Sequence, residues 1–304
     1  MGSLMRGRSY VLITAARDEE IHIERLIRCV IGQSILPQKW VIVSDGSRDR
    51  TDEIVRSYSV GHRFIEPVRI AHDGPRSFGG QACALNSGCE YLRDMSFEFV
   101  GFLDADISFG SDYIEGLLRK FSENPRLGLC GGSIFEKRRG AFRNRYGNRR
   151  NLVAGATLLF RRECYEGIGA YIPMKYGGYD WIANVMTRMN GWDVKSFPEF
   201  QVMHFRKTGA LASGLLRRKF RAGVSEYMLG YNPLFQMAKC VGRLFEGPYV
   251  LGSMLRAAGY YWAWLKKEER PVSVEFLRYV RDEQIQRMKS LFRIVTGTGW
   301  MEKR

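Results

Sequence analysis

Strand-like and helix-like patterns alternate through the first 125 residues of this 304-residue chain, and this alternation constrains the fold more than any other feature. Short apolar runs at residues 10–15 and 40–43 are typical of buried strands, whereas residues 19–33 carry apolar side chains at helical spacing. Further strands are expected at residues 63–70 and 97–103, and further helices after Thr51, at residues 81–93 and from Ser111 to Phe121. Regular alternation of this kind predicts a parallel sheet with helices on both faces.

Acidic side chains stand at the ends of three of these expected strands. Residues 18–20 (Asp-Glu-Glu) follow the first strand, Asp45 follows the second, and Asp104-Ala105-Asp106 follows the strand at residues 97–103. Ligands of open parallel sheets bind at the carboxyl ends of the strands, so these acids should face one crevice. Two carboxylates at such a strand end can converge on Mg²⁺ or Mn²⁺, which prefer oxygen ligands and substrate phosphates. The segment therefore predicts a divalent metal site, although a D-x-D sequence alone also fits a solvated turn.

The pattern changes after about residue 125. Strands are expected at residues 127–135 and 152–160 and a helix at residues 180–190, and the chain is helical in pattern from about residue 215. We expect an α/β domain over residues 5–210, with halves at about 9–125 and about 126–210. A helical extension over residues 211–304 follows, and residues 1–4 precede the expected natural start at Met5.

The chain is strongly basic, with a formal net charge of +15. Residues 137–150 (KRRGAFRNRYGNRR) hold seven basic residues and no acid, and a second basic cluster comprises Arg206, Lys207, Arg217, Arg218, Lys219 and Arg221. This charge indicates an anionic partner, which could be a nucleic acid, a membrane surface or a phosphorylated substrate. The basic segment 137–150 fits three roles: a solvated loop, a lid over a diphosphate or lipid phosphate, or a membrane contact.

Cellular location is constrained by the cysteines and by the hydropathy of the chain. The six cysteines form no C-x-x-C pair, which favours free thiols in a reducing cytosol. Residues 249–265 come nearest to a membrane span but are too short and contain Arg256. Aromatic residues 260–264 beside Lys266 and Lys267 fit either an interfacial helix or an ordinary surface helix. We expect a cytoplasmic protein, with peripheral contact at the cytoplasmic membrane face as the alternative.

Five segments, taken in order, resemble the family 2 glycosyltransferases of GT-A fold. They are residues 13–20 (ITAARDEE), 41–51 (VIVSDGSRDRT), 76–88 (RSFGGQACALNSG), 103–106 (LDAD) and 176–181 (YGGYDW). The resemblance covers about residues 9–206. It implies a Rossmann-like, mostly parallel sheet flanked by helices, in which residues 9–125 bind a nucleotide sugar and residues 126–210 face the acceptor. It also implies an inverting transferase that uses Mg²⁺ or Mn²⁺.

The resemblance assigns donor-binding roles to individual residues. Ala15, Arg17 and Glu19 would line the base and ribose pocket, Asp45 would accept a hydrogen bond from the base, and Arg76 would face the base or the diphosphate. Asp104 would reach the ribose or the metal, and Asp106 would hold the metal. The residue types fit, because a carboxylate suits a base N–H and a guanidinium suits phosphate. Asp45 could instead be a turn residue, and Glu19 a first-turn helix acid.

Asp180 is the candidate general base. Displacement at an anomeric carbon needs a carboxylate that takes the proton of the acceptor hydroxyl. Asp180 follows Gly177 and Gly178, which allow close backbone approach, but it could also cap the following helix. The family usually has Glu-Asp here and this chain has Tyr179-Asp180, which leaves the role of the first position open. His204 lies where relatives often complete the metal or diphosphate site, and imidazole is an acceptable Mn²⁺ ligand.

These residues predict a transferase that moves a sugar from a UDP- or GDP-type donor to a hydroxyl of a glycan or lipid-linked acceptor. A nucleotidyltransferase is an alternative, but such enzymes usually have a Gly-rich basic loop after the first strand. Residues 14–20 instead contain three acids and no glycine. A nucleic-acid-binding protein would also fit the net charge, yet the sequence contains no recognised nucleic-acid motif.

Overall fold

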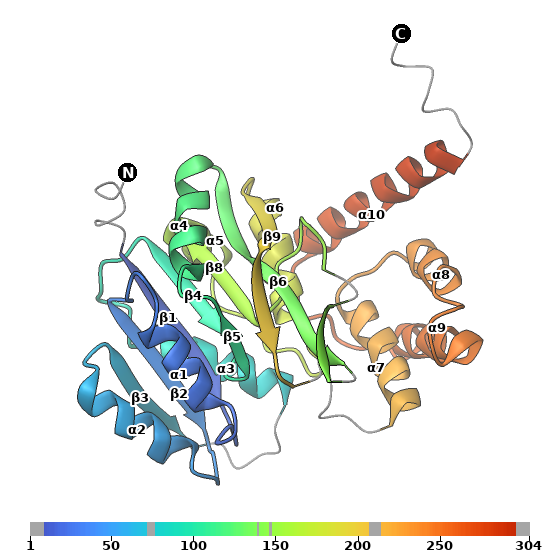
Figure 1. The fold of residues 1–304 in the computed structure, drawn as a ribbon. Helices are drawn as coiled ribbons and strands as arrows, with labels where there is room; N and C mark the ends of the chain where they lie inside the picture. The colour runs from blue at the N-terminus through green and yellow to red at the C-terminus, as the bar shows by residue number, and fades with distance from the viewer. Residues whose placement is uncertain (1–8, 72–76, 139, 146–147, 207–213, 296–304) are drawn as a thin grey trace. The chain divides into compact units, whose positions relative to one another are not determined.

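The computed structural model describes residues 9–71, 77–138, 140–145, 148–206 and 214–295. The chain divides into two compact units, Met1–Ala210 and Leu211–Arg304. The first is an α/β unit built on a single sheet, and the second is helical (Figure 1).

The sheet of the first unit has the strand order β3-β2-β1-β4-β8-β6-β9-β5, and β7 pairs with β6. The strands are β1 (Tyr10–Ala16), β2 (Lys39–Asp45), β3 (Ile65–Ile70), β4 (Phe99–Leu103), β5 (Ile107–Phe109), β6 (Leu127–Arg138), β7 (Ala141–Asn144), β8 (Thr157–Arg161) and β9 (Asp193–His204). Pairing is parallel from β3 through β2 and β1 to β4, and β6 is parallel to β9. The pairs of β8 with β4 and β6, and of β5 with β9, are antiparallel. The predicted parallel sheet is therefore confirmed for the first half, and the second half is mixed.

Six helices cover the two faces of the sheet. They are α1 (Ile23–Ile31), α2 (Thr51–Gly61), α3 (Phe78–Glu90), α4 (Tyr113–Glu123), α5 (Arg162–Ile168) and α6 (Tyr179–Met189). Successive side chains of a strand point to opposite faces, so Leu12 of β1 joins one core cluster while Val11 and Ile13 join the other. Apolar side chains of α1, α2 and α4 belong to the first cluster, and those of α3, α5 and α6 to the second. The sheet thus has a hydrophobic layer on each face.

The structure corrects several sequence expectations. Part of the basic segment 137–150 is strand β7, because the backbone of Ala141–Asn144 pairs with the extended end of β6. The strand β9 and the short helix α5 were missed. Thr51 is the first residue of α2 and not its cap: its hydroxyl accepts a hydrogen bond from another loop. Likewise Asp112, not Ser111, precedes α4 as its N-cap residue.

The second unit contains α7 (Leu215–Met228), α8 (Pro233–Val241), α9 (Tyr249–Leu265) and α10 (Val274–Val295). Helices α7 and α9 pack closely against each other at two glycines. A Cβ added to Gly223 would overlap the carbonyl oxygen of Arg256, and a Cβ added to Gly259 would overlap the carbonyl oxygen of Phe220. The expected C-terminal helices are thereby confirmed. None of the helices described here is long and apolar enough to cross a membrane.

Candidate active site

The loops after β1 and β2 are joined at the carboxyl edge of the parallel strands. Three successive backbone N–H groups, of residues 18–20, donate to side chains of the loop between β2 and α2 and of the first residue of α2. Asp18 donates to the Ser47 hydroxyl (3.2 Å), Glu19 to the Thr51 hydroxyl (2.8 Å) and Glu20 to the Asp49 carboxylate (2.9 Å). Side chains of the segment at residues 41–51 (VIVSDGSRDRT) therefore hold the acidic loop at residues 18–20 in place.

Thr51→Val is expected to lower the free energy of unfolding by about 1–3 kcal/mol, because it removes the acceptor of the buried Glu19 N–H without changing the side-chain shape. Urea unfolding measures this change. Ser59→Ala is the matched control, since the exposed Ser59 hydroxyl only bonds within its own helix. Equal effects of the two variants would show that the Thr51 contact adds nothing to stability.

Two of the predicted donor-binding residues form a buried ion pair. Arg17 Nη1 lies 3.4 Å from Asp45 Oδ2, and both residues are buried at the ends of β1 and β2. Ala15 lies near the end of β1 and is half-buried. The structure thus brings Arg17 and Asp45 together at the strand ends, where the sequence placed them. Arg76 lies outside the described residues.

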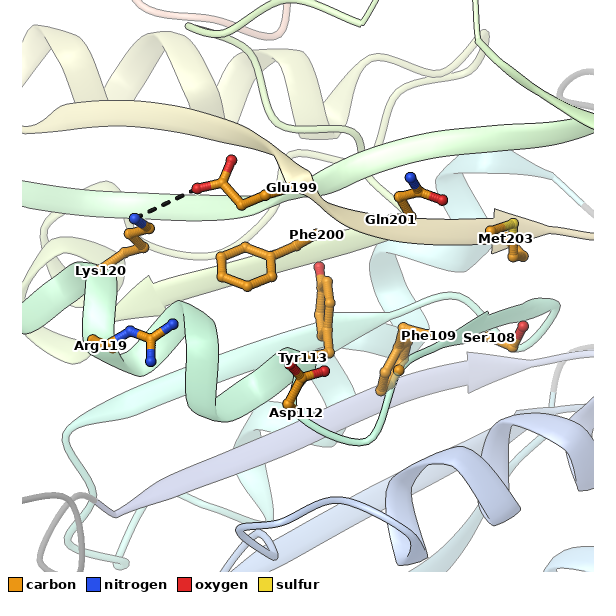
Figure 2. Close-up of a pocket in the computed structure, with 11 residues that line it drawn as sticks. Ser108, Phe109, Asp112, Tyr113, Arg119, Lys120, Glu199, Phe200, Gln201 and Met203 are labelled. Atoms are coloured by element: carbon orange, nitrogen blue, oxygen red, sulfur yellow. Dashed lines mark ion pairs between the residues drawn. The ribbon is translucent and has the colours of Figure 1, made fainter. Parts of the chain in front are cut away.

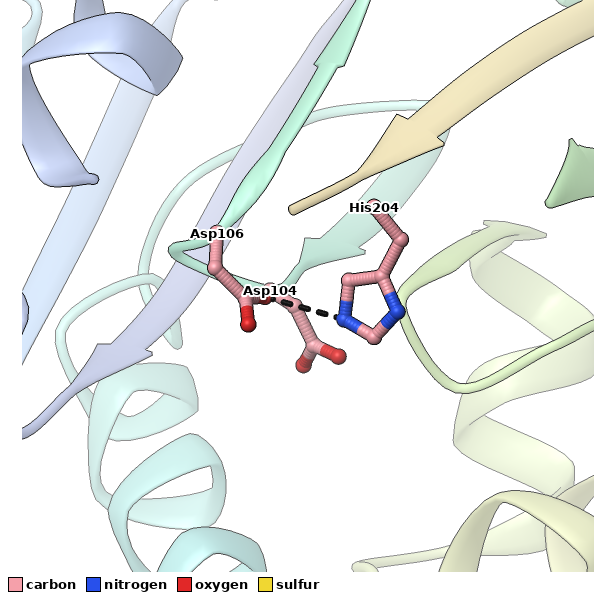
Figure 3. Close-up of side chains that lie close together, drawn as sticks. All are labelled: Asp104, Asp106 and His204. Carbon is pink, nitrogen blue, oxygen red and sulfur yellow. Dashed lines mark hydrogen bonds and ion pairs between the residues drawn. The ribbon is translucent and has the colours of Figure 1, made fainter. Parts of the chain in front are cut away.

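Asp104, Asp106 and His204 converge just beyond β4, at β5 and at the end of β9 (Figure 3). His204 is the register partner of Ile107, so the β5–β9 pairing places its imidazole beside Asp106. The Nε2 atom lies 3.1 Å from Asp106 Oδ1, and one ligand atom from each residue falls within 4.8 Å of the others. Residues 98 positions apart thus form one cluster of two carboxylates and an imidazole.

This cluster has the electrostatics of a cation site. Burial first, and then the Asp106 charge, raise the pKa of Asp104 to about 6. Burial acts to raise the pKa of Asp106, but the hydrogen bond with His204 holds the pKa of this carboxyl below its usual value. The buried Nδ1 of His204 has no hydrogen-bond partner among the described residues. Two carboxylates and one imidazole with an unsatisfied ring nitrogen fit Mn²⁺ or Mg²⁺.

Glu19 forms an ion pair with Arg206, an arginine that was not among the candidate site residues predicted from the sequence. Arg206 donates to both oxygens of Glu19, at 2.9 and 2.6 Å, and its Nε lies 3.8 Å from Asp106 Oδ2. Glu19 is almost completely buried, so it fixes the guanidinium beside the acidic cluster. In the sequence, Arg206 was noted only as a member of the second basic cluster. Its position beside Glu19 follows from the fold alone.

Asp180 lies in the first turn of α6, and Gly178, not Asp180, is the N-cap residue. The Asp180 Oδ2 atom accepts a hydrogen bond from the Gly155 N–H at 3.1 Å. A Cβ added to Gly155 would lie 2.9 Å from the same oxygen. Burial raises the pKa of Asp180, while backbone N–H groups and the Arg145 charge oppose the shift. The Asp104 N–H donates to the Ala156 carbonyl at 3.1 Å, so the adjacent residues Gly155 and Ala156 connect Asp180 to Asp104. Gln81, also missed from the sequence, donates to Asp104 Oδ1 at 2.9 Å.

A second glutamate and arginine connect the basic segment to the cluster. Glu136 of β6 is the register partner of His204 and is buried, and Arg145 Nε lies 3.6 Å from its Oε1. The Arg145 charge acts on the pKa values of both Asp180 and His204. Arg145 is thus the part of the basic segment that faces the acidic centre. Residues 139, 146 and 147 of that segment lie outside the description.

A separate cavity of about 580 Å³ lies between α4 and the β5–β9 pair (Figure 2). Phe109, Phe200 and Met203 line it, and the Lys120–Glu199 ion pair (3.4 Å) stands at its edge. Met203 precedes His204 along β9, so their side chains point to opposite faces. None of the predicted site residues lines this cavity, which is therefore distinct from the acidic cluster.

Comparison with known proteins assigns the family. Residues 11–178, more than half of the chain, match the model of glycosyl transferase family 2. The chain belongs to this family of transferase enzymes, which confirms the resemblance carried by the five sequence segments.

Curated relatives are similar over less than half of the chain. Poly-beta-1,6-N-acetyl-D-glucosamine synthase of Staphylococcus epidermidis is 29% identical over 133 residues, which cover 42% of this chain and 29% of that protein. A 4,4'-diaponeurosporenoate glycosyltransferase of Staphylococcus aureus is 28% identical over 123 residues, 40% of this chain and 30% of its own. The matched segment thus spans less than a third of either relative.

Solved structures share the fold. The mannosyltransferase PcManGT from Pyrobaculum calidifontis, in complex with GDP-Man and Mn²⁺, has a TM-score of 0.56 at 16% identity, covering 95% of this chain and 82% of its own. S. aureus TarS 1-349 in complex with UDP has a TM-score of 0.53 at 14% identity, covering 85% of this chain and 72% of its own. At these identities the similarity establishes a GT-A-type fold.

Proposed function

We propose that this chain is a metal-dependent inverting glycosyltransferase that moves a sugar from a nucleotide diphosphate sugar to an acceptor hydroxyl, with Asp180 as general base. The observation that carries the proposal is the connection of Asp180 to the Asp104–Asp106–His204 cluster through two adjacent residues: Asp180 accepts from the Gly155 N–H, and the Asp104 N–H donates to the Ala156 carbonyl. A base for the acceptor and a cluster suited to a metal and diphosphate thus share one site.

The transfer step follows from this arrangement. Asp180 takes the proton of the acceptor hydroxyl as the hydroxyl oxygen bonds to the anomeric carbon. The bond from that carbon to the diphosphate oxygen breaks, and its electron pair leaves with the nucleoside diphosphate. Attack from the face opposite the leaving group inverts the anomeric centre. The raised pKa of Asp180 suits this role, because a more basic carboxylate takes the proton more readily.

The remaining site residues would bind the donor. Asp106 and His204, with Asp104, would hold Mg²⁺ or Mn²⁺, which when bound stabilises the charge of the departing diphosphate. Arg206 stands beside this cluster and would contact the diphosphate, with Glu19 positioning it in addition to lining the nucleotide pocket. Ala15, Arg17 and Asp45 would line the base and ribose pocket, and Arg76 would face the base or the diphosphate.

Solved structures of similar fold were determined with GDP-Man or UDP, which supports a UDP- or GDP-type donor. We also propose a glycan or lipid-linked acceptor bound by residues 126–210, donor binding by residues 9–125, and a peripheral membrane role for residues 211–304. The family match gives no support to the nucleotidyltransferase and nucleic-acid-binding alternatives.

Asp106→Ala is expected to weaken donor binding in the presence of Mn²⁺ by roughly 100-fold or more, because it removes a ligand of the proposed metal. A thermal-shift screen of UDP-, GDP- and dTDP-sugars with Mn²⁺ identifies the donor, and calorimetric titration then measures its affinity. Asp112→Ala is the control, since Asp112 lines the separate cavity and should leave binding unchanged. Wild-type affinity that is indifferent to EDTA would disprove the metal assignment.

A further inference from the structure

Six large apolar side chains are exposed at one end of the helical unit. The exposed fraction ranges from 47% for Leu215 to 88% for Phe245. We call this set the apolar tip; it comprises Leu215, Leu216, Phe245, Tyr249, Val250 and Leu251. It combines the start of α7, the turn after α8 and the start of α9.

Packing within the unit brings these three segments together. The Lys219 side chain of α7 lies against Gly252 of α9, where an added Cβ would be 3.4 Å from Lys219 Cε. Gly252 follows Leu251 directly, so the starts of α7 and α9 are neighbours. In the turn after α8, Arg243 and Glu246 lie on either side of Leu244 and Phe245 in the sequence. Their charges also affect the pKa of Lys219. The tip is therefore one surface.

Basic side chains adjoin the tip residues in the sequence, and the one acid among them, Glu246, pairs with Arg243. Arg217, Arg218 and Lys219 follow the exposed leucines of α7, and Arg243 precedes Phe245. Burial first, and then the neighbouring Arg256, lower the pKa of Lys219, while the Glu246 charge opposes the shift. Residues 211–304 contain 17 basic and 8 acidic residues and so carry +9 of the +15 net charge. Anionic lipid headgroups complement such a rim, whereas a second copy of the unit would bring like charges together.

We propose that the apolar tip inserts into the surface of a membrane that contains anionic lipid, with the basic rim on the headgroups. Apolar and aromatic side chains gain by leaving water at the acyl boundary, and basic ones by approaching anionic headgroups. This surface differs from the aromatic run at residues 260–264 that the sequence suggested: Tyr260 of that run is buried, and the exposed Trp262 and Trp264 lie near the end of α9 and not at its start. The inference deepens the proposed function, on which it rests, by placing the enzyme at a lipid surface.

Co-sedimentation of the full chain with vesicles tests the proposal. The wild type should bind vesicles of phosphatidylcholine and phosphatidylglycerol at least about tenfold more tightly than phosphatidylcholine alone, since each basic side chain near the surface adds about fivefold. The variant Phe245→Asp/Leu251→Asp should bind at least about tenfold more weakly. Val60→Asp/Leu36→Asp is its matched control: the two positions in the α/β unit are 88% and 48% exposed, against 88% and 50% at the tip.

Charge reversal separates the basic rim from net charge. Arg217→Glu/Arg218→Glu should remove the preference for anionic vesicles, whereas Lys266→Glu/Lys267→Glu, with the same change in net charge, should retain it. Circular dichroism confirms that each variant is folded. Absent or lipid-independent vesicle binding, equal losses in tip and control variants, or a dimer that Phe245→Asp/Leu251→Asp dissociates without vesicle binding would overturn the proposal.

The vesicle measurement requires no donor and no transfer. Donor affinity, measured by titration with the sugar nucleotide found in the screen, should be unchanged in the tip variants. Loss of vesicle binding with intact donor binding would reject the docking surface alone. Intact vesicle binding in a wild-type chain that binds no nucleotide sugar would reject the proposed function alone.

Discussion

Asp180→Asn is expected to lower kcat/KM by roughly 10²–10⁴-fold while donor affinity stays at the wild-type level. The substitution keeps the size of the side chain and its contact with the Gly155 N–H, but an amide cannot accept the proton of the acceptor hydroxyl. Steady-state kinetics with the donor identified by the screen, together with calorimetric titration of that donor, separate the two effects. Unchanged turnover would rule out Asp180 as the base.

The matched control and the pH profile sharpen this test. Asp112→Asn makes the same chemical change beside the separate cavity and should leave kcat/KM unchanged. Burial raises the pKa of Asp180 above its usual value of 3.8, so the active carboxylate is lost as pH falls through this raised pKa. The acidic limb of the wild-type kcat/KM profile should follow that loss, and it should be absent in the residual activity of Asp180→Asn.

Glu226→Gln is expected to lower the stability of the helical unit by about 3 kcal/mol. Glu226 of α7 is buried and bonds to two other helices: it accepts from Arg256 of α9 (2.6 Å), from Lys239 of α8 (2.5 Å) and from Gln236 of α8 (2.8 Å). A neutral glutamine at position 226 leaves the positive charges of Lys239 and Arg256 without a negative partner in a largely buried environment. Urea unfolding followed by hydrogen exchange in α7 and α9 measures the loss.

The pKa of Glu226 gives the same magnitude independently. Burial alone would raise it, but the charges of Lys239 and Arg256 outweigh burial and lower it from 4.5 to about 2. This difference corresponds to about 3 kcal/mol of stability at neutral pH. The contribution is present above about pH 4.5 and is lost as pH falls towards 2, and the variant should lose this acid dependence. Glu246→Gln, at the more exposed Arg243–Glu246 pair, should cost less than about 1 kcal/mol; an equal cost would contradict this account.

Local patterns were sufficient to predict the first half of the fold. Apolar periodicity located β1, α1, β2 and β4 because each buries a continuous run or a stripe of side chains. The strand β9 was missed, since it alternates buried and exposed residues without a strong apolar run. Strand β7 was missed because it is exposed and basic, and only its pairing with β6 makes it a strand.

The family, the alternation of strands and helices, and the acids at the strand ends could all be predicted from the sequence, because they are short-range patterns of residue type. Which side chains meet depends on the three-dimensional fold. The β5–β9 pairing brings His204 to Asp106, the Glu19–Arg206 contact spans 187 residues, and α6 packs Asp180 against Gly155. Helix packing likewise gathers the apolar tip from three separate segments. Such contacts depend on strand register and helix packing, in which distant parts of the chain act together, so no local pattern encodes them.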